Sequence, residues 1–116
     1  MNANEKIRSQ ARMNAEEIQI VIDEAKTSAV SISGLLVIRE DVSIMVRLYL
    51  DGIQQGNNQD ELLAFQPYIA NISTELKVLN DTIISIINNM DYDEDNTLQN
   101  LEQLKIALLQ LADIDT

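Results

Sequence analysis

A regular apolar spacing between residues 69 and 90 is the clearest pattern in the chain. Apolar side chains recur there at alternating intervals of three and four residues: Ile69, Ile72, Leu76, Leu79, Ile83, Ile86 and Met90. This heptad spacing places them on one face of an α-helix. Pro67 lies just ahead of the run, and its fixed φ angle suits the first turn of a helix. The pattern therefore predicts a helix that opens at Pro67 and carries a coiled-coil-like seam.

A second seam predicts a helix from about residue 96 to residue 113. Leucines repeat the same intervals there: Leu101, Leu104, Leu108 and Leu111. Two polar segments, residues 51–61 and 91–96, divide the chain into three blocks. Because the connection at 91–96 is short, the helices on either side of it are expected to pack antiparallel.

The block from residue 7 to residue 53 fits two interpretations. A heptad register through it is mostly apolar, with three polar exceptions: Asn14, Ser28 and Arg39. A polar Asn on such a seam often fixes register or oligomeric state. Residues 42–50 also alternate between apolar and polar, as they would in a β-hairpin. Helix is favoured because polar side chains fall on one stripe at helical spacing: Glu40, Ser43, Arg47, Asp51 and Gln54.

The sequence therefore predicts an all-α fold, with residues 1–116 forming a single helical domain. We expect a three- or four-helix antiparallel bundle with coiled-coil-like heptad seams. The long first helix is expected to break near Gly34, within a run of Ser and Gly. The alternative is an α+β fold with a β-hairpin at residues 30–50.

Apolar residues surround the segment from residue 35 to residue 50 on most sides. A small bundle is not expected to bury all of them, so this segment is predicted to self-associate or to bind a partner helix. The side chains expected at that interface are Leu35, Val42, Met45, Val46, Tyr49 and Ile53.

Composition excludes most catalytic chemistry. The chain contains no Cys and no His, which removes thiol nucleophiles, disulfides, imidazole bases and zinc sites built on these ligands. It has one Phe, three Tyr and no Trp, so an aromatic-lined ligand pocket is not expected. The remaining metal candidate is a hard cation held by oxygen ligands. An enzyme is therefore not expected.

The charge is strongly negative and unevenly distributed. The formal net charge is -11, and residues 51–116 carry twelve acidic side chains against two basic ones. Such a chain repels nucleic-acid phosphates and anionic lipids, so neither is an expected partner. The first residues lack the apolar core of a signal peptide, and no apolar run is long enough to span a bilayer. The expected location is the cytoplasm or the interior of a virion or similar assembly.

The stretch DYDEDNTLQNLE, residues 91–102, resembles the calcium loop of an EF-hand. The residues that correspond to ligand positions are Asp91, Asp93, Asp95, Thr97 and Glu102. Calcium prefers six to eight oxygen ligands, which alternate carboxylates and a final bidentate Glu supply. Asn96 stands where the family has Gly, and the chain contains no second loop of this kind.

The acidic residues also fit purely structural roles. Asp and Asn favour the start of a helix, and Asn96 with Gln99 forms a plausible capping arrangement for the last helix. The neighbouring carboxylates Glu16–Glu17 and Glu40–Asp41 are expected on solvated helix faces, because no apolar pocket or basic cluster accompanies them.

Three functional hypotheses follow. The first is a non-enzymatic interaction or assembly protein: an adaptor, an assembly factor or a structural subunit that binds a protein partner or forms a homo-oligomer through its seams. In size and composition the chain is similar to small phage-type virion or accessory proteins. The second is an acidic inhibitor or DNA mimic that binds a basic partner. The third is a calcium-responsive switch at residues 91–102, with calcium as the one cofactor to consider.

Overall fold

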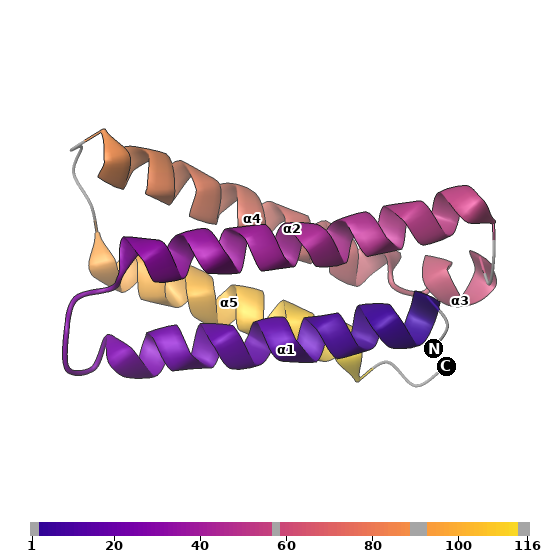
Figure 1. The fold of residues 1–116 in the computed structure, drawn as a ribbon, viewed down its shortest axis with the longest axis horizontal. Coiled ribbons are helices and arrows are strands. Elements are labelled where there is room, and N and C mark those ends of the chain that lie inside the picture. Colours follow the sequence, from indigo (N-terminus) through magenta and orange to yellow (C-terminus); the bar gives the residue numbers. More distant parts are fainter. Residues whose placement is uncertain (1–2, 57–58, 89–92, 114–116) are drawn as a thin grey trace.

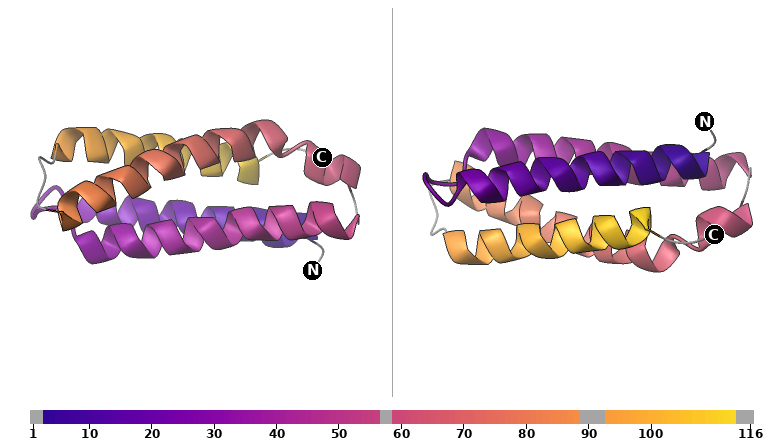
Figure 2. Two further views of the ribbon diagram at one scale, coloured as in Figure 1. Left: turned by 90° about the horizontal axis from the view of Figure 1, so that it is seen from above. Right: turned by 90° about the horizontal axis from the view of Figure 1, so that it is seen from below.

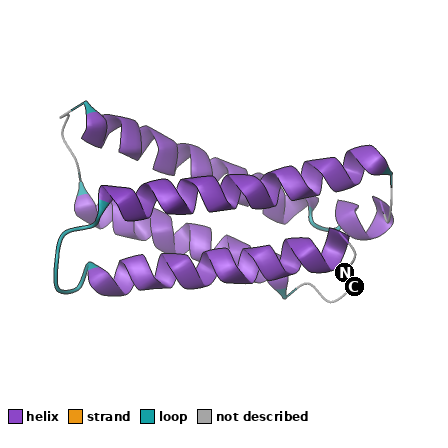
Figure 3. Ribbon diagram, in the orientation of Figure 1, coloured by secondary structure: helices purple, strands orange, loops and turns teal. Residues whose placement is uncertain are grey.

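The computed structural model describes residues 3–56, 59–88 and 93–113, and within them the fold is all-α (Figure 3). The helices are α1 (Ala3–Glu24), α2 (Ile32–Gln55), α3 (Gln59–Leu63), α4 (Gln66–Ile87) and α5 (Glu94–Ala112). The predicted all-α class is confirmed. The segment for which a β-hairpin was the alternative is one continuous helix, α2, and the described ranges contain no strand.

The four long helices form an antiparallel bundle of two layers (Figures 1 and 2). α1 packs against α2 and α5, and α4 also packs against α2 and α5. Each long helix therefore has two main neighbours, and the layers are the α1–α2 pair and the α4–α5 pair. The short helix α3 lies at one end of the bundle, beside the end of α2 (Figure 1).

The break in the first block lies at residues 25–31, ahead of the predicted position at Gly34. The hydroxyl groups of Thr27 and Ser28 donate hydrogen bonds to the Glu24 carbonyl at 3.3 and 3.1 Å. The Lys26 and Thr27 N–H groups donate to carbonyls three residues back, those of Asp23 and Glu24, both at 3.2 Å, so the helical turn tightens where α1 ends. Ser31 then caps α2, because its Oγ accepts a hydrogen bond from the Gly34 N–H at 3.3 Å.

Gly34 has a packing role instead. It lies in the first turn of α2, and a Cβ at this position would stand 3.2 Å from Cγ2 of Val21 on α1. This is tighter than ordinary van der Waals contact. The missing side chain therefore allows α1 and α2 to approach closely at this level.

The start of α5 differs from the predicted Asn96 cap. Asp93 is the N-cap residue, and its carboxylate accepts a hydrogen bond from the Asn96 N–H at 3.1 Å. The Thr97 hydroxyl donates a bond to the Asp93 carbonyl at 2.9 Å. Glu94 and Asp95 occupy the first turn, where negative charge is favourable.

The core is aliphatic, as the seams predicted. Four of the heptad positions on α4 are buried: Ile69, Ile72, Leu79 and Ile83. The four leucines of the last seam are buried as well. Leu62 and Phe65 close the core near α3, and both are fully buried. Each such side chain contributes about 1.5–3 kcal/mol through burial.

Candidate functional site

The structure places most of the expected interface residues inside the bundle. Leu35, Val42, Met45 and Tyr49 are buried within the single chain, and Val46 and Ile53 pack partly buried against the same core. α2 packs against both α1 and α4, so the apolar stripe that it buries is wider than a single heptad seam. In the single chain these residues therefore pack the bundle, and the more exposed apolar side chains of α2 lie at other positions.

Other apolar side chains on α1 and α2 do face outward. Met13, Ile20, Val37 and Ile44 expose 52%, 56%, 52% and 37% of their surface. Met13 and Ile20 are seven residues apart on α1, as are Val37 and Ile44 on α2. Residues seven apart lie on the same side of a helix. Glu17 and Asp41 lie four residues after the first member of each pair and three before the second, so each acid shares that side of its helix.

The register between the two helices brings these positions together. Val21 lies against Gly34, and the Asn14 side chain donates a hydrogen bond from Nδ2 to the Asp41 carbonyl at 3.2 Å. Because α1 and α2 are antiparallel, this register places Met13 level with Ile44 and Ile20 level with Val37. We call the surface formed by Met13, Glu17, Ile20, Val37, Asp41 and Ile44 the α1–α2 face.

A shallow groove of about 270 Å³ runs along one end of the α1–α2 face. Glu17, Ile20 and Val21 line it from α1, and Ser33, Gly34, Val37 and Ile38 line it from α2. The missing side chain at Gly34 leaves this part of the surface concave. The groove is mostly apolar, with the Glu17 carboxyl at one end of it.

Two carboxyl groups meet at the middle of the α1–α2 face. Burial, followed by a hydrogen bond with Asp41 and the negative charge of Asp41, together raise the pKa of Glu17 from 4.5 to about 7. Oε2 of Glu17 is buried and has no hydrogen-bond partner among the described residues. At neutral pH, protonated and ionised forms of Glu17 therefore coexist.

The described ion pairs leave this carboxyl pair uncompensated. Lys26 pairs with Asp23 at 3.2 Å, and Arg47 approaches Glu40 at 3.9 Å. Both pairs are well exposed. Among the described residues, no ion pair includes Glu17 or Asp41. The face thus combines exposed apolar side chains with an acidic centre.

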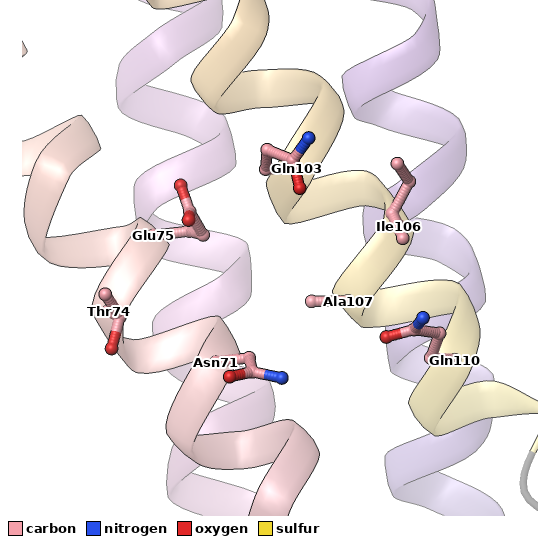
Figure 4. Close-up of a pocket in the computed structure, with 7 residues that line it drawn as sticks. All are labelled: Asn71, Thr74, Glu75, Gln103, Ile106, Ala107 and Gln110. Atoms are coloured by element: carbon pink, nitrogen blue, oxygen red, sulfur yellow. The ribbon is translucent and has the colours of Figure 1, made fainter.

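A second concavity, between α4 and α5, is polar. It measures about 320 Å³, and its lining side chains come from both helices (Figure 4): Asn71, Thr74, Glu75, Gln103, Ile106, Ala107 and Gln110. The buried Asn100 donates from Nδ2 to the carbonyl and carboxylate oxygens of Glu75 at 3.1 and 2.8 Å. Its Oδ1 has no hydrogen-bond partner in the described part of the chain. The groove offers three side-chain amides, one hydroxyl and one carboxylate, which can bind polar groups.

The residues of the calcium prediction are distributed along α5. Asp91 lies outside the described residues. Asp93 caps the helix, and Glu102 pairs with Lys105 at 2.8 Å. Nine residues of helix separate Asp93 from Glu102, which corresponds to about 13 Å along the axis. The described residues contain no group of three or more His, Cys, Asp or Glu that could hold a metal ion. Calcium binding stays a prediction, and it requires the first turns of α5 to rearrange.

The sequence predicts Glu17 and Asp41 as members of two solvated pairs, Glu16–Glu17 and Glu40–Asp41. The structure instead pairs one member of each across two helices. It also exposes four apolar residues that the seam analysis passed over. The sequence feature that indicates this face is the same on both helices: two apolar residues seven positions apart with an acidic residue between them, at positions 13, 17 and 20 and at positions 37, 41 and 44.

No protein-family model matches the chain, and neither a curated protein nor a solved structure matches it at a significant level. Among the helices of the described residues, none is both long and apolar enough to cross a membrane.

Proposed function

We propose that the protein is a non-enzymatic interaction protein that binds a helix of a partner protein on its α1–α2 face. The observation that carries this proposal is the matched set of exposed apolar side chains, Met13 and Ile20 on α1 and Val37 and Ile44 on α2. An amphipathic helix docks into a groove between two helices through apolar anchors spaced by whole turns. The seven-residue spacing of these side chains fits such anchors.

The chemistry of the chain supports binding over catalysis. Cys and His are absent from the sequence, so the usual nucleophiles and bases of catalysis are missing. An exposed apolar patch rimmed by polar residues is instead typical of a protein-binding surface. The role as adaptor, assembly factor or structural subunit remains a prediction, and so do the acidic-inhibitor and calcium-switch hypotheses.

The test uses a designed helical peptide of about 18 residues, long enough to form an isolated helix. It carries two leucines seven residues apart and an arginine between them. Binding is followed by amide chemical shifts of the isotopically labelled protein. We expect shifts on α1 and α2 and weak, saturable binding.

The matched variants distinguish this face from other exposed apolar positions. The double variant Ile20→Ser, Val37→Ser should lose binding. The control double variant Ile84→Ser, Ile87→Ser removes similarly exposed side chains from α4 and should keep it. Equal binding by both double variants would show that the peptide does not recognise the α1–α2 face.

A further inference from the structure

We propose that the partner helix is basic, and that one of its arginine or lysine side chains inserts between Glu17 and Asp41 while apolar residues on either side contact Ile20–Val37 and Met13–Ile44. This inference rests on the proposed function and adds the chemistry of the partner. The face then has three levels along its length: an apolar pair, a carboxyl pair and a second apolar pair.

The carboxyl pair lacks the donors that an ionised pair needs. Oε2 of Glu17 is buried without a hydrogen-bond partner among the described residues, and Asp41 adds a second negative group beside it. A guanidinium group carries several N–H donors in one plane and matches two carboxylates in geometry and charge. Its positive charge next to the pair removes the repulsion between the two acids, and its N–H groups donate to their accessible carboxylate oxygens.

Cations on α2 and α5 have partners other than the carboxyl pair. On α2, Arg39 donates to the Asn80 side chain of α4 at 3.1 Å, and Arg47 lies near Glu40. On α5, the Lys105 ammonium contacts Gln19 at 2.7 Å and Glu102 at 2.8 Å. Among the described residues, the charged group that interacts with Glu17 is Asp41. A partner is thus the natural source of a compensating charge.

An uncharged partner helix fits the face less well. Covering the α1–α2 face removes water from Glu17, and an ionised carboxylate without a partner is costly to bury. A neutral helix would therefore bind the protonated form of Glu17. A basic helix binds the ionised form and releases a proton.

A second copy of this chain is also a poor occupant. In a two-fold dimer through this face, the central carboxyl pairs of the two copies would meet near the axis. Each copy also carries a formal charge of -11. Like charges at such short range oppose association, whereas the same charge attracts a basic segment and speeds its encounter.

The test compares three peptides that differ only at the central position between the two leucines: Arg, Gln and Glu. We expect the Arg peptide to bind wild-type protein at least about tenfold more tightly than the Gln peptide, and the Glu peptide to bind most weakly. Because the pKa of Glu17 is about 7, affinity for the Arg peptide should rise by up to about tenfold between pH 6 and pH 8. The Gln peptide should show no such rise.

Two double variants locate the effect. Glu17→Gln, Asp41→Asn should remove the preference for Arg over Gln without weakening the Gln peptide, and circular dichroism checks that the variant is folded. The control Glu16→Gln, Glu40→Gln removes the same formal charge from neighbouring exposed positions and should retain the preference.

Each outcome decides the inference. Equal binding of the Arg and Gln peptides to wild type overturns it and leaves the proposed function standing, whereas no binding of any peptide overturns both. If the control variant Glu16→Gln, Glu40→Gln loses the preference for the Arg peptide over the Gln peptide, the effect is one of overall charge, and the inference is also overturned. A dimer by light scattering that disappears in Ile20→Ser, Val37→Ser would assign the face to a second copy instead.

Discussion

Replacing Glu17 by Gln should stabilise the protein at pH 8 and leave its stability almost unchanged at pH 4.5. The pKa of Glu17 is raised in the folded state from 4.5 to about 7, chiefly by burial and then by Asp41. The folded chain therefore holds this proton more tightly than the unfolded chain does. The stabilisation from the protonated carboxyl is complete below about pH 4.5 and is lost as the pH rises through about 7. Gln keeps a neutral, hydrogen-bonding side chain at every pH.

The magnitude follows from the shift. A rise from 4.5 to about 7 corresponds to an upper limit of about 3 kcal/mol, at about 1.4 kcal/mol for each pH unit. Glu17 is only half-buried, and water screens part of the repulsion from Asp41. We therefore expect Glu17→Gln to raise the free energy of unfolding by about 1–2 kcal/mol at pH 8.

The assay is urea denaturation of wild type and variant at pH 4.5, 6, 7 and 8. Many other carboxylates titrate over this range, so the quantity that matters is the difference between the two proteins at each pH. Glu16→Gln changes the adjacent, exposed carboxylate and serves as the control for loss of one charge. A Glu17→Gln variant that matches the control at pH 8, or that is less stable than wild type there, would refute the argument.

The remaining predictions concern the bundle itself. Leu104→Ala should lower the free energy of unfolding by about 2–5 kcal/mol because Leu104 is fully buried, whereas the partly exposed Leu109→Ala should cost well under that in the same urea titration. Asp93→Ala should lower the free energy of unfolding by about 1 kcal/mol through loss of the α5 cap. Asp93→Asn, which keeps a capping side chain, should retain most of the wild-type stability in thermal melts. Gly34→Leu should destabilise by about 1–3 kcal/mol in urea titrations because its side chain would push α1 away from α2; an unchanged midpoint would argue against close packing there. If residues 91–102 bind calcium, calorimetric titration should give a saturable heat that Glu102→Gln abolishes, and no heat with wild type would end that hypothesis.

The seams were the most predictable part of the fold. On α4 and α5 every position of the named heptad registers is apolar, so periodicity alone gives the helix and its buried side. The first block was harder, since α1 ends in a tightened turn of local backbone hydrogen bonds, Lys26 N–H to the Asp23 carbonyl and Thr27 N–H to the Glu24 carbonyl. Periodicity does not report such bonds, and glycine at residue 34 was the more conspicuous candidate.

The surface was harder to predict than the core. α2 carries more apolar residues than one seam can bury, and some of them are indeed exposed in the structure. Most of the residues predicted for the interface are buried in the bundle. The sequence of α2 alone does not report how many helices pack against it, and that number decides how much of its apolar surface is covered. α1 and α4 together cover most of one side of α2. What remains outside is Val37 and Ile44, with Leu50 further along the helix.

The carboxyl pair shows why an interhelical site escapes inspection of the sequence. Along each helix, periodicity fixes which residues share a side, but it does not fix how far one helix slides along the other. Here the slide is set by the approach of Gly34 to Val21 and by the bond from Asn14 to the Asp41 carbonyl. A shift of one turn, about 5.4 Å, would separate Glu17 from Asp41 and place each acid beside an apolar residue. The acidic centre of the α1–α2 face is therefore a consequence of one glycine contact and one asparagine bond.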